Sequence, residues 1–134
     1  MGAKQFTELR CWQRSTELKR RVYAVCARQP AAGDRDFCSQ VRRAAAVAPR
    51  NISEGFARFS HREFHQFLRI ARGSLGELQD ALIDARDRGY LSEPEFTELW
   101  DISEQAIRLT TGLMRYLNPS KDREFRQRPP REGR

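Results

Sequence analysis

The sequence has few of the residues that metal, disulfide and membrane chemistry require. Its 134 residues include two histidines and three cysteines, Cys11, Cys26 and Cys38, and no two cysteines form a CxxC pair. No apolar run reaches the roughly 18 residues of a transmembrane helix, and Met1 to Arg14 lacks the apolar centre of a secretory signal. We therefore expect a cytoplasmic protein with reduced, buried thiols and no membrane contact.

Catalytic and cofactor-binding motifs are missing as well. The chain has no phosphate-binding loop, no dinucleotide fingerprint and no nucleophile elbow. His61 and His65 stand one helical turn apart, but no HExxH motif and no third ligand accompany them. Gly73 and Gly76 fall inside a helical pattern, where we expect them to let helices approach closely rather than to bind phosphate. We predict no catalytic residue, no metal and no cofactor.

Lysine is scarce, although the chain is strongly basic. Lys4, Lys19 and Lys121 are the three lysines among 25 basic residues, and the net charge is +7. Residues 1–72 carry 15 basic and 6 acidic side chains, whereas residues 73–118 carry 4 and 9. Because guanidinium groups pair with phosphates and stack on bases, this asymmetry favours a surface that binds polyanions. A solvated surface with no partner is the alternative.

Apolar residues recur at helical spacing in four segments, and no long alternating segment predicts a sheet. We expect helices over residues 6–28, 36–55, 60–89 and 92–117. The capping boxes Ser60–Glu63 and Ser92–Glu95 begin the last two, and Gly55 and Gly89 are expected to end the second and third. Short connections then predict an all-α, up-down-up-down four-helix bundle over residues 1–118. The Arg- and Pro-rich tail, 119–134, is expected to be disordered.

The apolar arc of the fourth segment is wider than one bundle core needs, which is about 100°. One edge of the arc consists of residues at steps of seven, and these are Trp100, Ile107 and Met114. The opposite edge has the same spacing, with Ile102, Leu109 and Tyr116. We expect the edge of Trp100, Ile107 and Met114 to contact another copy of the chain in a homo-oligomer.

One edge of the second predicted helix is polar and lies beside the apolar stripe; it holds Gln40, Arg43, Val47, Asn51 and Glu54. We favour a structural role for this edge, with an i,i+4 ion pair between Arg50 and Glu54. A polar functional site that includes Asn51 and Glu54 is the alternative. Pro49 predicts a kink, because it leaves a carbonyl one turn earlier without its usual donor. We also expect Asn51 to make a side-chain hydrogen bond.

Three motifs, in this order and spacing, resemble the signature of one bacterial family. They are Gln40-Val41-Arg42-Arg43-Ala44, Asn51-Ile52-Ser53-Glu54-Gly55 and Ile70-Ala71-Arg72-Gly73-Ser74-Leu75-Gly76-Glu77-Leu78. Over about residues 5–117 the chain is similar to the four-helix bundle proteins encoded in intervening sequences of the large-subunit ribosomal RNA gene. The resemblance departs at Val47-Ala48, where the family often has a serine and an aliphatic residue.

The resemblance implies a fold and a set of partners. It implies a bundle that assembles into a ring, commonly a homopentamer. It also implies kinship to accessory proteins of diversity-generating retroelements, which bind nucleic acid and a reverse transcriptase. The motif residues to which it gives structural roles are Gln40, Arg43, Pro49, Asn51, Glu54, Gly55, Ser74 and Glu77.

Two functions are compatible with these patterns. The first is a non-enzymatic accessory protein that binds RNA or DNA through an arginine-rich surface. The arginines we predict as contacts lie away from the apolar stripes or in the connection between helices, and they are Arg42, Arg50, Arg58, Arg62 and Arg69. The second function is a protein–protein scaffold with no affinity for nucleic acid. Of the two, the clustered arginines favour nucleic acid.

Overall fold

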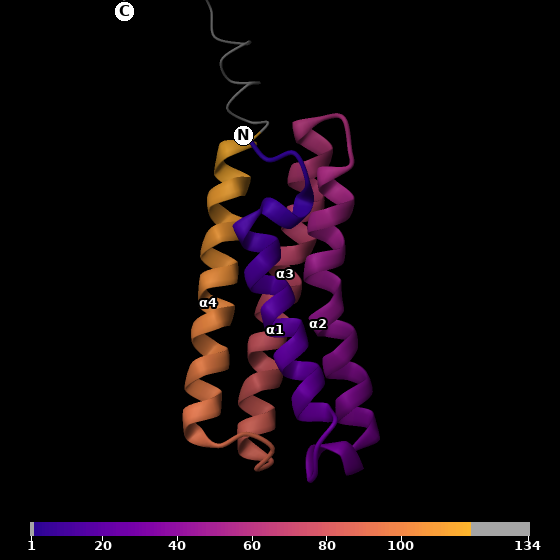
Figure 1. The fold of residues 1–134 in the computed structure, drawn as a ribbon, viewed down its shortest axis with the longest axis vertical. Coiled ribbons are helices and arrows are strands. Elements are labelled where there is room, and N and C mark those ends of the chain that lie inside the picture. The colour runs from indigo at the N-terminus through magenta and orange to yellow at the C-terminus, as the bar shows by residue number, and fades with distance from the viewer. Residues whose placement is uncertain (1, 119–134) are drawn as a thin grey trace, which may run out of the picture.

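The computed structural model describes residues 2–118, which form four α-helices and no strands (Figure 1). The helices are α1 (Arg10–Cys26), α2 (Arg35–Phe56), α3 (His61–Asp87) and α4 (Glu93–Tyr116). Two short 3-10 helices, η1 (Phe6–Glu8) and η2 (Ala31–Gly33), precede α1 and α2. The all-α fold class is therefore confirmed. The predicted disordered tail lies outside the described residues.

The four helices pack lengthwise around one apolar core. α1 and α3 each pack against both α2 and α4, so the α1–α2 and α3–α4 edges lie on opposite sides of the bundle. The fully buried aliphatic side chains come from all four helices and include Leu18, Ile52, Leu68, Leu75 and Leu99. Across residues 2–118, no helix is long and apolar enough to cross a membrane.

The predicted start of the first helix at residue 6 was wrong, because the chain bends at Leu9. Leu9 has an extended backbone (φ −73°, ψ 126°) and buries its side chain. Before this bend, η1 is closed by a reciprocal capping box in which Glu8 accepts from the backbone N–H of Gln5 at 2.8 Å. Phe6 then packs edge-to-face on Trp12, with ring centroids 5.3 Å apart. α1 therefore begins at Arg10.

The capping box predicted for the fourth helix is confirmed, whereas at the third helix only the serine half of the predicted box forms. The Ser60 hydroxyl accepts from the Glu63 N–H at 3.1 Å, and the Ser92 hydroxyl accepts from the Glu95 N–H at 3.3 Å. Glu95 returns a hydrogen bond to the Ser92 N–H at 3.0 Å. Gly89 follows α3 with φ +80°, a conformation that favours glycine after a helix. Local sequence signals are therefore enough to place these ends.

α2 continues through Pro49 to Phe56, so Gly55 does not end it. The Asn51 side chain donates to the Val47 carbonyl at 2.8 Å, which confirms the predicted hydrogen bond within the protomer. Gly55 instead permits close packing, since a Cβ there would lie 2.7 Å from Phe67 Cβ and 2.8 Å from Phe64 Cδ1. α2 and α3 thus pack tightly where the sequence predicted a helix end.

Gly73 and Gly76 do not bring helices together within the chain, contrary to expectation. Both are exposed, and a Cβ built at either position meets no other atom within 4 Å. The buried contact of this motif is made by Ser74, whose hydroxyl donates to the Ala44 carbonyl of α2 at 2.9 Å. The serine, rather than the glycines, joins α3 to α2.

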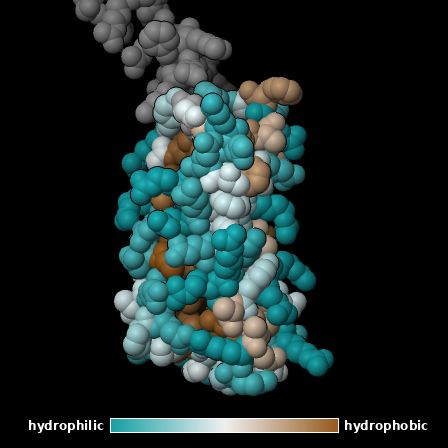
Figure 2. All heavy atoms as spheres, in the orientation of Figure 1, coloured by the Kyte–Doolittle hydropathy of each residue, from teal (hydrophilic) through white to brown (hydrophobic). Residues whose placement is uncertain are grey.

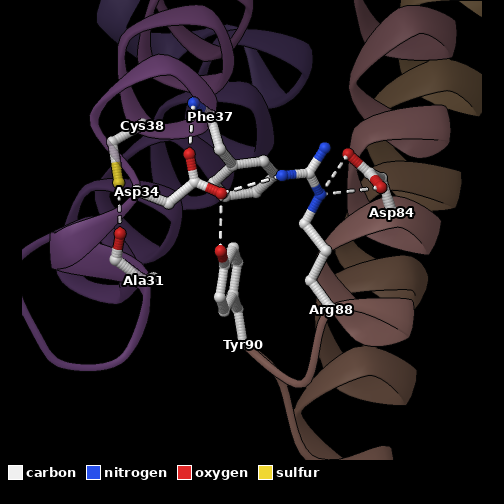
Figure 3. A network of polar contacts seen from close by, with 7 residues as sticks. All are labelled: Ala31, Asp34, Phe37, Cys38, Asp84, Arg88 and Tyr90. Carbon is white, nitrogen blue, oxygen red and sulfur yellow. Dashed lines mark hydrogen bonds and ion pairs between the residues drawn. The ribbon is translucent and has the colours of Figure 1, made fainter.

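A polar network joins the start of α2 to the end of α3 (Figure 3). Asp34 caps α2 by accepting from the Phe37 N–H at 3.1 Å, and its other oxygen accepts from the Tyr90 hydroxyl and from Arg88. Arg88 also donates to both carboxylate oxygens of Asp84, at 3.0 and 3.1 Å. The Tyr90 hydroxyl, followed by the Phe37 N–H and Arg88, holds the pKa of Asp34 below its usual value. Asp34 and Asp84 are therefore committed to structural contacts.

Candidate nucleic-acid interface

The ion pairs of residues 2–118 divide the arginines into two groups. The paired arginines are Arg14 with Glu17, Arg21 with Glu98, Arg28 with Glu95, Arg86 with Asp87, and Arg88 with Asp34 and Asp84. In this part of the chain, none of the five predicted contacts, Arg42, Arg50, Arg58, Arg62 and Arg69, has an ion-pair partner. All five are exposed. Their charges are thus available to an anion from outside the chain.

The predicted ion pair between Arg50 and Glu54 is wrong. Both side chains are exposed on α2, but no such pair forms. An exposed i,i+4 pair on a helix is worth only about 0.3–0.5 kcal/mol, so solvation of the two groups competes with it easily. Arg50 instead lines a groove between α1 and α2.

This groove, the α1–α2 groove, has a volume of about 260 Å³. It is lined by Trp12, Lys19 and Tyr23 of α1 and by Ala46, Pro49, Arg50 and Ser53 of α2. No acidic residue lines it, so its two cations are not neutralised locally. In Figure 2, which views the bundle as in Figure 1, hydrophilic side chains cover most of the visible face and apolar atoms appear between them. The groove combines positive charge with aromatic surface.

The groove residues of α1 were not among the predicted site residues, because aromatic side chains such as Trp12 and Tyr23 at helical spacing usually indicate a buried face. Trp12 is half-buried, but Tyr23 is 40% exposed. The spacing Trp12, Thr16, Lys19, Tyr23 follows one helical stripe beside the buried face, and that stripe is the signal that could have found them. Thr16 is buried, and its hydroxyl has no hydrogen-bond partner among the described residues.

Arg42 belongs to the same side of α2 as Arg50. It lies near the Cys26 thiol at the end of α1, where its charge partly opposes the burial that raises the pKa of Cys26 to about 12. Burial also raises the pKa of Cys11, to about 11. Both thiols are therefore protonated at neutral pH and are poor nucleophiles. The residues around the groove are suited to binding rather than to thiol chemistry.

Arg62 and Arg69 lie on a different surface, on the outer side of α3. The side of α3 that faces α4 is marked by Gln79, which bonds to Ser103, and by Arg86, which stacks over Phe96. At 100° per residue, Arg62 and Arg69 fall opposite the buried stripe of Phe64, Leu68 and Leu75, so they point outward from the bundle. The five predicted arginines therefore do not form one patch, because Arg42 and Arg50 lie beside α1.

Arg58 and its neighbours occupy the turn between α2 and α3. The Arg58 guanidinium stacks over the Phe67 ring, 4.9 Å from its centroid. Phe59 is fully exposed at the tip of the turn. On the neighbouring α3 surface, burial and then the charge of Arg69 lower the pKa of His65. Within residues 2–118, no three metal-binding side chains lie together.

The remaining motif residues lie where α2 meets α3. Gln40 and Glu77 line a small pocket of about 170 Å³ between these helices, together with Asp80 and Asp84. Arg43 and Glu54 are exposed, and Pro49 is buried at the side of the α1–α2 groove. Among the motif residues, Asn51 and Ser74 make side-chain hydrogen bonds within the chain, Gly55 packs tightly against α3, and Pro49 is buried.

The edge of α4 predicted as an oligomer interface is half-buried within the protomer. Ile107 and Met114 pack against the core, and Trp100 stacks beside Phe96 at 5.6 Å between ring centroids. The large apolar side chains that are more exposed lie elsewhere, and they are Tyr23, Phe59, Ile70 and Tyr116. Part of the wide apolar arc is therefore used inside the chain.

Comparison with known proteins places this architecture in a family. Residues 7–112 match the family model of the 23S rRNA-intervening sequence protein. The chain belongs to this family. The match includes every residue of the α1–α2 groove and all five predicted arginines, so these surfaces lie within the 23S rRNA-intervening sequence protein domain. No curated protein matches the sequence.

Proposed function

We propose that this 23S rRNA-intervening sequence protein is a non-enzymatic nucleic-acid-binding protein that uses unpaired arginines on an oligomeric bundle. The observation that supports the proposal is that some arginines form ion pairs within the chain whereas others do not. Within residues 2–118, acidic side chains such as Asp84, Glu95 and Glu98 pair with arginines of α1 and of the α3 end, whereas Arg42, Arg50, Arg58, Arg62 and Arg69 have no ion-pair partner.

The physical basis is electrostatic attraction without base-specific readout. Exposed arginines stay hydrated and charged, and each phosphate that they neutralise releases a condensed counterion. The positive balance of residues 1–72 would be repeated in each subunit of an oligomer. The family resemblance implies kinship to accessory proteins of diversity-generating retroelements. Because those proteins bind nucleic acid and a reverse transcriptase, the kinship supports the same proposal and adds a reverse transcriptase as a proposed further partner. The proposed location is the cytoplasm, where protonated thiols stay reduced, and such unreactive thiols are compatible with a non-enzymatic role.

A titration of the wild-type protein tests the proposal. Structured RNA, single-stranded DNA and duplex DNA are each titrated at two salt concentrations, with fluorescence anisotropy as the readout. We expect the logarithm of the association constant to fall linearly with the logarithm of the salt concentration, with a slope of about −0.7 to −0.9 for each phosphate contact. Absence of binding to all three probes at low salt would overturn the proposal and favour a protein–protein scaffold, for which exposed Ile70 and Phe59 are candidate contacts.

We also propose that the chain forms a ring-shaped homo-oligomer, most simply a pentamer, of up-down-up-down bundles. The short turns between consecutive helices support the helix order. The half-buried row Trp100, Ile107 and Met114 supports an interface along α4, because rings and aliphatic groups only partly covered in a protomer gain from further burial. Multi-angle light scattering should give several times 15.6 kDa. A monomer that persists at high micromolar concentration would refute the oligomer.

A further inference from the structure

We infer that the α1–α2 groove is a binding site for single-stranded nucleic acid, with one base stacked on Tyr23 beside Trp12 and the adjoining phosphates held by Lys19 and Arg50. This inference rests on the proposed function and deepens it, since it names the strand type and the site. Nucleic-acid binding by the outer surface of α3 alone would satisfy the proposed function but not this inference.

The cations of the groove come from two helices and converge on one space. Lys19 is half-buried on α1 and Arg50 is exposed on α2, and both line the same cavity. Neither has an ion-pair partner in the part of the chain that the structure describes. On α1 the nearest acid in sequence, Glu17, is held by Arg14 at 2.8 Å. A phosphate that enters the groove therefore does not compete with a carboxylate of the chain for these cations.

The aromatic rings of the groove provide a surface on which a base can stack. Tyr23 is 40% exposed, and its side chain has no ring contact or hydrogen bond among residues 2–118, so its ring is available for stacking. Trp12 is fixed by its edge-to-face contact with Phe6. Rings on a rigid helix lose little conformational freedom when a base stacks on them, and such stacking accepts any base because every base has a π-face.

The size and shape of the groove favour a single strand over a duplex. Its volume of about 260 Å³ lies below the roughly 300–1,000 Å³ of sites for drug-sized ligands, which suits one base rather than a larger group. A base can reach Tyr23 only if it leaves its own stack, and that step is cheapest when the strand is already unpaired.

The test compares ring and non-ring variants on matched probes. Wild type, Tyr23→Phe, Tyr23→Leu and Tyr23→Ala are titrated with a fluorescent single-stranded RNA and with the duplex of the same sequence. Stacking on one ring corresponds to a loss of about five- to hundredfold on removal of the ring. We expect that loss for Tyr23→Ala and Tyr23→Leu on the single strand only, and near wild-type binding for Tyr23→Phe. Circular dichroism melting of each variant checks that it folds.

Four outcomes would overturn the inference. Tyr23→Ala could bind the single strand as tightly as wild type, or lose single strand and duplex equally. Phe59→Ala, at the exposed turn, could show the loss in place of Tyr23→Ala, which would move the site to the turn. Finally, Tyr23→Ala could change the mass in light scattering, which would assign the groove to contacts between copies of the chain. If the wild type binds no probe, the proposed function fails first.

Discussion

Replacing Gly55 with alanine is expected to destabilise the bundle by about 1–3 kcal/mol, the range for overpacking of a tight contact. The new methyl group would lie 2.7 Å from Phe67 Cβ, 2.8 Å from Phe64 Cδ1 and 3.3 Å from the Phe64 carbonyl oxygen. Two of these atoms belong to or adjoin the α3 backbone, so a rotamer change cannot relieve the clash. The better helix propensity of alanine, worth up to about 1 kcal/mol, opposes this cost but does not exceed it.

Gly73→Ala and Gly76→Ala are matched controls in the neighbouring helix. Both glycines lie inside α3, and a methyl group at either position meets no atom within 4 Å. Alanine there should stabilise by about 0.5–1 kcal/mol, because it restricts the unfolded chain and favours the helix. Urea denaturation midpoints give the comparison. A rise for Gly55→Ala similar to that for Gly73→Ala would show that α2 and α3 are not in such close contact.

Reversing the charge of the groove with Lys19→Glu and Arg50→Glu should weaken nucleic-acid binding by at least about a hundredfold at low salt. Each charge-assisted hydrogen bond to a phosphate contributes about 1.5–3 kcal/mol, and two are lost. The new carboxylates also repel the strand. The slope of the logarithm of the association constant against the logarithm of the salt concentration should decrease by the contribution of about two phosphate contacts. Anisotropy titrations over a range of salt concentrations measure this slope.

The double variant Arg62→Glu with Arg69→Glu changes the net charge by the same amount on the outer side of α3. It separates contact in the groove from the overall charge of the protein. We expect a smaller loss than for the groove variant, because these two arginines do not line the groove and added salt screens their effect on a strand bound there. Equal losses for the two double variants would show that binding follows net charge and not the groove.

The sequence predicted those features that depend on local chemistry. The starts of α3 and α4 were placed by Ser60 and Ser92, whose hydroxyls close the first turn, and the end of α3 by Gly89. These signals act over three or four residues, so they survive without knowledge of the packing. The spacing of leucine and alanine along α3 likewise predicts the buried face of a helix.

Features that depend on contacts between segments were not predicted. The bend at Leu9 follows from burial of its side chain, and the role of Gly55 follows from two phenylalanines on another helix. For the candidate site, arginine composition identified Arg50, but Lys19 and Tyr23 join it only when α1 packs beside α2. Whether Arg50 is paired also depends on the fold, because its spacing from Glu54 permits an ion pair that does not form.

Photo-crosslinking tests the central claim most directly. A single-stranded RNA that carries 4-thiouridine is irradiated with the wild-type protein, and the attached peptides are identified by mass spectrometry. The account predicts crosslinks within residues 12–23 of α1 and 46–53 of α2, and their loss in the Lys19→Glu, Arg50→Glu variant. Crosslinks confined to residues 58–72, with none on the groove, would contradict it.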